Sequence, residues 1–271
     1  MIFKALKMDG LGNDFLIIDN RSQSINLKPE QIQRLSNREN GIGFDQLISI
    51  ENSEQNDAEI KYFNSDGKTA NACGNGNRCV SDILLSETTN ETVNFKVGNF
   101  IHLGKKISEG VMEVSMPKPT QVLHNIPVTS EVNENPVKIE IKQKKLTGHL
   151  VNVGNPHIIF FEAISDEKLK EIGPLIENHQ IFPDRTNVTF ADIKDKNNIH
   201  VNVWERGAGQ TLACGTAACA TAFVAISSDL ANDPVNIHFK LGFLKIKINE
   251  DKTLLMQGPI SQRQEISVEI Q

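Results

Sequence analysis

The sequence has no apolar run long enough to cross a bilayer, and its first residues have no signal-type apolar core. It also has no excess of positive charge, since 28 Lys and Arg stand against 34 Asp and Glu, for a net charge of -6. We therefore expect neither nucleic acid nor a membrane as a partner. Without an export signal, the 271-residue chain is expected to be cytoplasmic.

Cysteine is scarce, and its spacing excludes two common kinds of site. The four cysteines stand at positions 73, 79, 214 and 219, so no pair has the Cys-x-x-Cys spacing of zinc or thiol-redox sites. The histidines show no metal-ligand spacing either, and we expect no metal. Because cytosolic thiols stay reduced, the cysteines are expected to be working or packing thiols and not a disulfide framework.

The most informative stretch surrounds Cys214. A charged, glycine-rich loop over residues 204–215 delivers this cysteine to an uncharged run, 216–226, built mostly from Ala, Val, Phe and Ile. A helix that is apolar on all sides must be buried, so its N-terminus aims backbone N–H groups into the protein beside Cys214. We predict that this position lowers the pKa of the thiol and makes it a usable base.

The same layout occurs a second time. Residues 64–76 form a similar loop that delivers Cys73 to another predicted helix, which runs through Leu85. The two cysteines are separated by a distance in sequence (214 − 73 = 141) that other polar residues share. The matching pairs are Asn64 with Glu205, Gln46 with Asn187 and, one residue further apart, Asn13 with Asn155. This duplication predicts two similar domains, divided after residue 117.

Each half is predicted to have many strands around one buried helix, which defines an α+β fold. In the first half we expect strands at 2–8, 14–19, 47–50, 58–63, 93–95, 100–103 and 111–116, with helices at 29–38 and behind Cys73. In the second we expect strands at 137–141, 149–153, 157–161, 186–191, 199–205, 235–240, 243–248 and 253–256, with helices at 166–179 and 216–226. A last strand is expected within 264–270.

Two helix-mouth cysteines, one from each copy, suit a site in the cleft between the domains. Across a pseudo-two-fold axis, one thiolate could remove a proton from a carbon acid while the opposite thiol returns one to the other face. A helix terminus contributes only about 0.3–2 kcal/mol, so donors fixed on the substrate carboxylate must supply more. The predicted donors are the backbone N–H groups of Gly74, Asn75, Gly215 and Thr216.

Other polar side chains have two interpretations each. Arg206 is predicted to bind a second carboxylate and Glu205 an ammonium group, although an isolated pair of this kind is more often a surface ion pair. His157 could tune a thiol, bond the substrate or be a structural histidine. Asn13 and Gln46 could stabilise a turn and a strand start or face the site.

With these residues in place, the chain resembles the diaminopimelate epimerase family over almost its whole length. The matching segments are Met8–Phe15, Ala72–Gly76, Gly154–His157 and Trp204–Gly215. The resemblance implies a pyridoxal-phosphate-independent, cofactor-free isomerase that converts LL- to meso-diaminopimelate in lysine and peptidoglycan precursor synthesis. It implies two pseudo-symmetric domains, 1–117 and 118–262, each a mostly antiparallel, barrel-like sheet around a central helix. It also implies a homodimer, and a tail, 263–271, that returns to the first domain.

The resemblance also assigns roles. It implies that Cys214 is the base toward the LL isomer and Cys73 the acid, with roles exchanged in reverse, and that His157 and Glu205 tune the thiol pKa. The implied substrate contacts are Asn13, Gln46, Asn64, Gly74, Asn75, Asn155, Asn187, Glu205, Arg206, Gly215 and Thr216. One departure is Ala217, where many members have Gly; Ala there is harmless in a helix and costly at positive φ.

Two other functions are consistent with parts of this pattern. A proline or hydroxyproline racemase would also use two opposed cysteines, but a monocarboxylate imino acid has no distal end for Arg206 to hold. A thiol-redox sensing protein would instead form a reversible disulfide between Cys73 and Cys214. The redox alternative predicts no solvent deuterium in an amino acid.

Overall fold

The computed structural model describes residues 1–70 and 73–270 of the chain. The chain forms two compact units: unit 1 comprises Met1–Ser115 and Gln257–Gln271, and unit 2 comprises Met116–Met256. The boundaries expected after residues 117 and 262 fall a few residues later than these. Asn71 and Ala72 of the predicted cysteine loop and Gln271 of the predicted tail lie outside the described residues.

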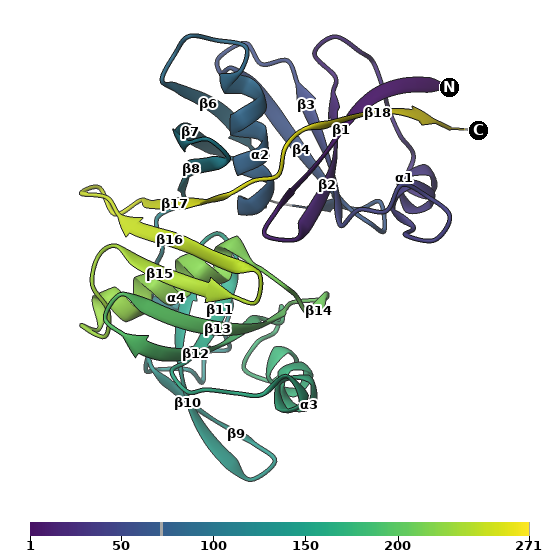
Figure 1. The fold of residues 1–271 in the computed structure, drawn as a ribbon. Helices are drawn as coiled ribbons and strands as arrows, with labels where there is room; N and C mark the ends of the chain where they lie inside the picture. The colour runs from purple at the N-terminus through teal and green to yellow at the C-terminus, as the bar shows by residue number, and fades with distance from the viewer. Residues whose placement is uncertain (71–72, 271) are drawn as a thin grey trace. The chain divides into compact units, whose positions relative to one another are not determined.

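Unit 1 is a curved sheet with one helix inside it and one outside it. Its elements are β1 (Ile2–Gly10), β2 (Asn13–Asp19), α1 (Pro29–Ser36), β3 (Gln46–Glu51), β4 (Ala58–Asn64), β5 (Thr69–Ala70), α2 (Gly74–Leu85), β6 (Thr92–Val97), β7 (Phe100–Ser108), β8 (Val111–Met116) and β18 (Gln264–Glu269). Pairing follows the order β18-β1-β2-β3-β4-β6-β7-β8, with β2–β3 and β4–β6 parallel and the other pairs antiparallel. Helix α2 contacts both β1 and β7, so the sheet wraps around it (Figure 1).

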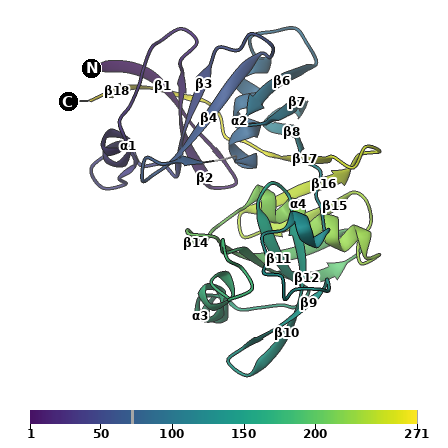
Figure 2. The same ribbon diagram turned by 180° about the vertical axis from the view of Figure 1, so that it is seen from behind.

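The C-terminal tail pairs with the first strand of the chain. In β18, Val268 lies opposite Phe3 and Ile266 opposite Ala5, in antiparallel register. The N-terminal ammonium of Met1 donates to the carbonyl oxygen of Ile270 at 2.6 Å. Figure 2 shows both chain ends beside β1 and β18. The tail therefore completes the edge of the unit 1 sheet.

Unit 2 repeats the pairing order of six strands of unit 1, β1-β2-β3-β4-β6-β7. Its elements are η1 (Leu123–Asn125), β9 (Val137–Ile141), β10 (Lys144–Asn152), β11 (Pro156–Phe160), α3 (Asp166–Glu177), β12 (Asn187–Asp195), β13 (Asn198–Glu205), β14 (Gly209–Gln210), α4 (Gly215–Ser227), β15 (Val235–Phe239), β16 (Gly242–Ile248) and β17 (Leu254–Pro259), the last of which continues into unit 1. The order is β9-β10-β11-β12-β13-β15-β16, with β11–β12 and β13–β15 parallel. These parallel pairs correspond to β2–β3 and β4–β6, so the structure contains the duplication.

The fold class is confirmed, with one correction. The structure is α+β with two similar units, each a mostly antiparallel sheet around one buried helix. Within the described strands of unit 1, no pairing joins the outer strands β18 and β8, so the expected barrel-like sheet is open and not closed. The helix makes closure unnecessary, because it fills the space that the inward side chains of a closed barrel would occupy.

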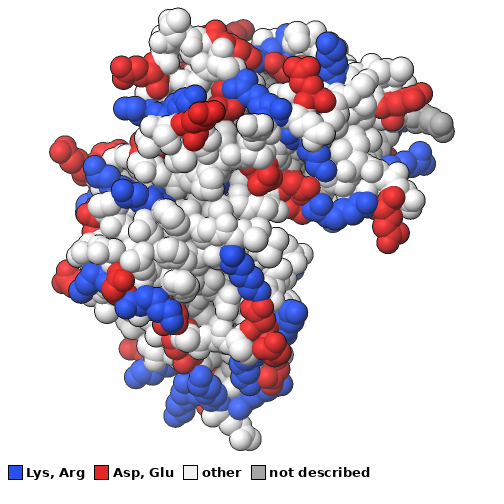
Figure 3. Space-filling model, viewed as in Figure 1, with Lys and Arg blue, Asp and Glu red and all other residues white. Residues whose placement is uncertain are grey.

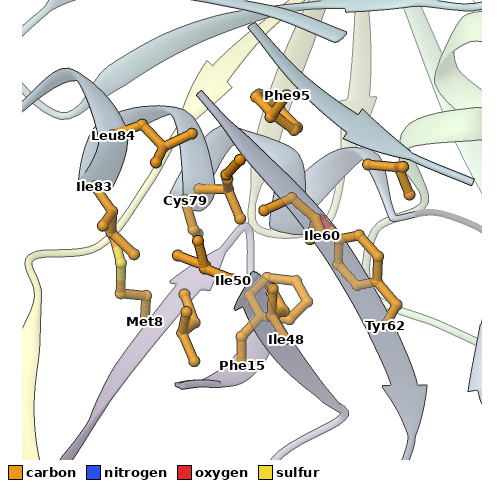
Figure 4. Close-up of a cluster of buried hydrophobic side chains, with 14 of the residues drawn as sticks. Met8, Phe15, Ile48, Ile50, Ile60, Tyr62, Cys79, Ile83, Leu84 and Phe95 are labelled. Carbon is orange, nitrogen blue, oxygen red and sulfur yellow. The ribbon is translucent and has the colours of Figure 1, made fainter. Parts of the chain in front are cut away.

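The core of unit 1 has two layers because β2 is covered on both faces. Phe15 and Ile17 point inward to α2, where they pack with Ile48, Tyr62 and Cys79 (Figure 4). The alternate β2 residues belong to a second cluster, beneath α1. A strand buried on both faces reads as a continuous apolar run, as 15–18 does. Each large side chain in these layers contributes about 1.5–3 kcal/mol by leaving water.

Of the charged residues that the structure describes, Arg78 and Glu177 are buried, and the other Lys, Arg, Asp and Glu residues are exposed or half-buried. On the face shown in Figure 3, Lys and Arg are interspersed with Asp and Glu. Among the described residues, none of the helices combines the length and the apolarity that crossing a membrane requires.

Candidate active site

Each unit delivers one cysteine to the start of its central helix in the same backbone conformation. Cys73 is the N-cap of α2, with φ −142° and ψ 108°, and Cys214 is the N-cap of α4, with φ −137° and ψ 113°. An N-cap residue stands beside the first backbone N–H groups of a helix, which have no partner within it. The prediction that both cysteines lie at helix mouths is therefore confirmed. Ala217 is inside α4, so alanine is favourable there.

In unit 1, the Cys73 thiol contacts an amide that is held from behind. Its Sγ donates to Oδ1 of Asn13 at 3.4 Å, and Nδ2 of Asn13 donates to Asp45 Oδ2 at 2.9 Å. Arg38 in turn bonds Asp45 at 2.7 Å and Asp14 at 2.8 Å. Because a carboxylate accepts only, Asp45 turns the NH2 group of Asn13 toward itself and the carbonyl oxygen toward the thiol.

Two other predicted residues of unit 1 meet directly. Strands β3 and β4 place Gln46 opposite Asn64, and Gln46 Nε2 donates to Asn64 Oδ1 at 2.9 Å. Within the described part of the chain, Gln46 Oε1 is buried and has no hydrogen-bond partner. Such an atom costs free energy unless a ligand or water satisfies it. Gln46 is therefore a ready acceptor for a donor group of a ligand.

The first turn of α2 is held by a buried arginine. Gly74 and Asn75 open the helix, and both are buried. The guanidinium of Arg78, itself fully buried, donates to Asn75 Oδ1 at 3.1 Å and to the Pro259 carbonyl at 3.4 Å. These bonds hold the turn whose backbone N–H groups were predicted to bind a carboxylate.

In unit 2, a chain of polar contacts leads to Cys214. The ring Nε2 of His157 bonds Oδ1 of Asn155 at 2.9 Å, and Asn155 Nδ2 donates to Thr216 Oγ1 at 3.4 Å. Thr216 Oγ1 lies 3.4 Å from the Cys214 sulfur. His157 thus fixes the Asn155 amide much as Asp45 fixes that of Asn13, and it reaches the thiol only through two intermediates.

The predicted substrate-binding turn after β13 is also organised by side chains. The backbone N–H of Arg206 donates to Asn187 Oδ1 at 3.0 Å, and Asn187 Nδ2 donates to the Pro156 carbonyl at 2.9 Å. Thr211 Oγ1 donates to the Glu205 carboxylate at 2.5 Å. The Arg206 side chain bonds the Asp184 carbonyl at 3.1 Å. Asn187, Glu205 and Arg206 therefore lie together, as predicted.

The pKa of Cys214 is opposite to the prediction. Burial raises the thiol pKa well above its ordinary value, and the Glu205 carboxylate raises it further, while the Thr216 hydroxyl and the Ala217 backbone N–H lower it. Full burial shifts a pKa by as much as about 3–5 units, whereas a helix terminus supplies at most about 2 kcal/mol, or about 1.5 units. Burial therefore outweighs the helix terminus.

His157 cannot tune a thiol by carrying positive charge. Burial and the nearby Arg206 guanidinium lower the pKa of its ring to about 3, so the ring is neutral at ordinary pH. The hydrogen bond to Asn155 indicates a positioning role instead.

Three contributing residues were absent from the sequence-based site. Asp45 directs the Asn13 amide, Thr211 holds the Glu205 carboxylate and Arg78 holds the first turn of α2. Arg78 had a usable signal, because an arginine near the start of a predicted buried helix, next to Cys79, must have buried partners. Asp45 and Thr211 are common residue types in loops, and nothing in their spacing distinguishes them.

The chain shares its two-unit fold with a class of solved structures. A solved hydroxyproline epimerase from Agrobacterium vitis superposes with a TM-score of 0.73 at 12% identity, covering 98% of this chain and 91% of that one. A probable proline racemase from Agrobacterium radiobacter superposes with a TM-score of 0.72 at 13% identity, covering 100% and 94%. At such low identity these likenesses establish the fold alone.

The sequence identifies the family within this class. The family model described as diaminopimelate epimerase matches residues 5–101 and 149–262. A diaminopimelate epimerase of Pelagibacter ubique is 44% identical over the full length of both chains. One of Leptospira biflexa is 37% identical, over 93% of this chain and 94% of its own. The chain belongs to the diaminopimelate epimerase family and is an isomerase.

Proposed function

We propose that this protein interconverts LL- and meso-2,6-diaminopimelate, without a cofactor, in lysine and peptidoglycan precursor synthesis. The observation that carries the proposal is the pair of N-cap cysteines with matching backbone angles in a chain of this family. We further propose a cytoplasmic homodimer whose partner is the amino-acid substrate, with neither nucleic acid nor membrane bound.

In the proposed reaction, the two cysteines act on opposite faces of one α-carbon. From the LL isomer, the Cys214 thiolate takes the α-proton, and the Cys73 thiol gives its proton to the other face. Cys214 ends as a thiol and Cys73 as a thiolate, so the reverse reaction exchanges their roles. The Asn13 carbonyl supports the acid role of Cys73, because it accepts a hydrogen bond from the protonated thiol.

Substrate binding has to help Cys214 lose its proton. The raised thiol pKa disfavours the thiolate in the empty site, and part of that effect comes from the Glu205 carboxylate. A substrate ammonium group that pairs with Glu205 neutralises this charge and lowers the pKa of Cys214 when the base is needed. The buried acceptor Gln46 Oε1 is available to a donor group of the substrate.

The substrate carboxylates are assigned to two kinds of donor. At the reacting centre, the backbone N–H groups of Gly74, Asn75, Gly215 and Thr216 would receive the negative charge that develops as the carboxylate becomes enolate-like. At the distal end, the Arg206 guanidinium would bind the second carboxylate, which distinguishes diaminopimelate from a proline-type substrate. Asn64, Asn155 and Asn187 would bond the remaining polar groups.

The test is to follow LL-diaminopimelate with the reduced enzyme in deuterated water by NMR. We expect conversion to the meso isomer with deuterium entering at one α-carbon, and loss of conversion in Cys73→Ala and in Cys214→Ala. Absence of both exchange and conversion in the wild-type enzyme would sink the proposal. Proline and hydroxyproline would then be tried with the same readout, and a redox function examined if they too fail.

A further inference from the structure

We infer that Glu177 is a positioning residue for the substrate-binding turn and controls the binding of the substrate's distal end. This inference rests on the proposed function, in which Glu205 and Arg206 bind the amino acid. Glu177 is the last residue of α3, on the outer side of the unit 2 sheet, and the proposed chemistry does not use it.

Glu177 is a buried carboxylate that collects three donors. Its side chain accepts from the indole Nε1 of Trp204 at 2.8 Å, from the backbone N–H of Gly207 at 2.8 Å and from Arg185 Nη1 at 3.3 Å. The residue is only 5% exposed. A buried carboxylate is tolerated when such bonds satisfy it, and bonds to an ionised acceptor are about twice as strong as neutral ones.

The two closest donors flank the substrate-binding pair. Trp204 precedes Glu205, and Gly207 follows Arg206, so one carboxylate holds both ends of the segment that carries the charges. Gly207 has φ +78°, a left-handed conformation that favours glycine, and the turn is closed there. Holding both ends limits the directions in which the two side chains between them can point.

The other half of the molecule shows that this contact is a built feature. Ser36 ends α1 as Glu177 ends α3, and the two are separated by the repeat distance (177 − 36 = 141). The Ser36 hydroxyl donates to the Ser65 carbonyl at 3.0 Å, so it too ties the end of an outer helix to a loop, here the loop after β4, the counterpart of β13. In unit 2 a charged acceptor replaces the hydroxyl, and its loop carries Arg206 where unit 1 has Ser65.

The arrangement predicts an effect mainly on KM. Arg206 would bind a carboxylate remote from the reacting carbon, and such binding is the same in the ground state and the transition state. Glu205, which influences the base Cys214, is held separately by Thr211. Loss of the Glu177 charge should therefore loosen the Arg206 end of the turn and leave the Cys214 end in place.

The test compares Glu177→Gln with Glu171→Gln, a matched change on the exposed face of the same helix, where the carboxylate pairs with Lys142 and Lys168. Trp204, the single tryptophan of the chain, reports the contact by fluorescence. For Glu177→Gln we expect KM for diaminopimelate to rise about tenfold and kcat to change less than about threefold. We also expect Trp204 emission to move to longer wavelength. Glu171→Gln should match the wild type in all three.

A second variant covers the case in which Glu177→Gln does not fold. Trp204→Phe keeps an aromatic ring against Gly173 and removes the Nε1 donor together with part of the indole ring, so KM should rise about fivefold. An unchanged KM in either folded variant, or a fall in kcat without a rise in KM, overturns the inference and leaves the proposed function standing. No epimerisation by the wild-type enzyme overturns the proposed function, and the inference with it.

Discussion

Cys214 is subject to opposing electrostatic influences of unequal size. Burial and the Glu205 carboxylate raise the pKa of the thiol, and two hydrogen-bond donors at the start of α4 lower it. A base with a raised pKa is rarely ionised but strong once ionised, which suits removal of a weakly acidic α-proton. In the proposed mechanism Glu205 thus has two effects, since it binds the ammonium group and keeps Cys214 protonated until that group arrives.

We predict that Glu205→Gln lowers the pKa of Cys214 while it abolishes most of the activity. Removing the carboxylate removes one of the causes that raise the pKa, so the pH midpoint of Cys214 alkylation by iodoacetamide should move to lower pH. Mass spectrometry would measure the extent of alkylation at each pH. The midpoint of that curve does not depend on how slowly the reagent reaches the thiol. Glu162→Gln, an exposed carboxylate in unit 2 paired with Lys144, is the control. A midpoint that stays or rises contradicts the prediction.

At the residue scale, the repeat predicted the main site residues but not their environment. Cys73, Cys214 and their polar companions were found because each has a counterpart in the other half. Asp45 was missed because its importance lies in a contact with Asn13, from another strand, that no local pattern marks. The predicted direction of the Cys214 pKa shift was wrong, because the sequence shows where a helix begins but not how deeply the thiol is buried.

At the element scale, sequence predicted the helices well because each has a clear apolar pattern or end signal. Helix α2 ends at Leu85 as expected, and α1 begins at Pro29. The two-residue strands β5 and β14 were missed, because pairs so short have no period to detect. Each of them follows a turn and pairs with the predicted strand before that turn. They are therefore stabilised by this pairing and not by the β propensity of their own residues.

The first turn of α2 has no room for an added methyl group at Gly76. A Cβ there would lie 2.7 Å from the Tyr62 ring and 2.9 Å from the Ile48 side chain. We predict that Gly76→Ala destabilises the protein by up to about 2 kcal/mol, because overpacking costs about 1–3 kcal/mol and the better helix propensity of alanine offsets about 1. Activity should fall as well, since the displaced turn carries Cys73. Chemical denaturation and epimerase rates would measure both.

A second substitution checks the cause of that loss. In Gly76→Ala with Ile48→Val, the shorter side chain removes one of the two close contacts, so part of the lost stability and activity should return. If the stability loss of the double variant equals the sum of the losses of the two single variants, crowding at this turn is not the cause of the loss in Gly76→Ala.

At the scale of the whole molecule, duplication explains both the likeness and the differences of the two units. The strand order and the parallel pairs recur in the two units, and the repeat predicted this recurrence. The open sheet edges could not be predicted, because they depend on long-range pairing that the sequence does not display. The copies have diverged at equivalent positions, with Asn64 where unit 2 has Glu205 and Ser36 where it has Glu177. The two ends of diaminopimelate carry the same groups, but in the proposed reaction one end reacts while the other is only bound, and this needs such unequal halves.

Both units contain a buried neutral histidine, and this predicts how the whole protein responds to acid. Burial lowers the pKa of His102 in unit 1 to about 4, although its bond to the Ser115 carbonyl raises it, and burial with Arg206 lowers that of His157 in unit 2 to about 3. Because the folded pKa values lie below the ordinary histidine value of 6.5, the unfolded chain binds more protons in acid. The stability from these rings is complete above pH 6.5 and is lost as pH falls toward 4 and 3.

We predict that the free energy of unfolding falls by about 1.4 kcal/mol per pH unit for each ring within this window. His102→Gln should be less stable at pH 7, because it loses the stacking on Phe95, but its stability should decline less steeply between pH 6.5 and 4.5 than that of the wild type. Denaturant titrations at several pH values would measure the slopes, with His124→Gln, at an exposed position, as the control. Equal slopes in His102→Gln and the wild type would mean that His102 is charged in the folded protein. The buried contact between Asn77 and the His102 ring, and the packing around α2 that depends on this contact, would then need another explanation.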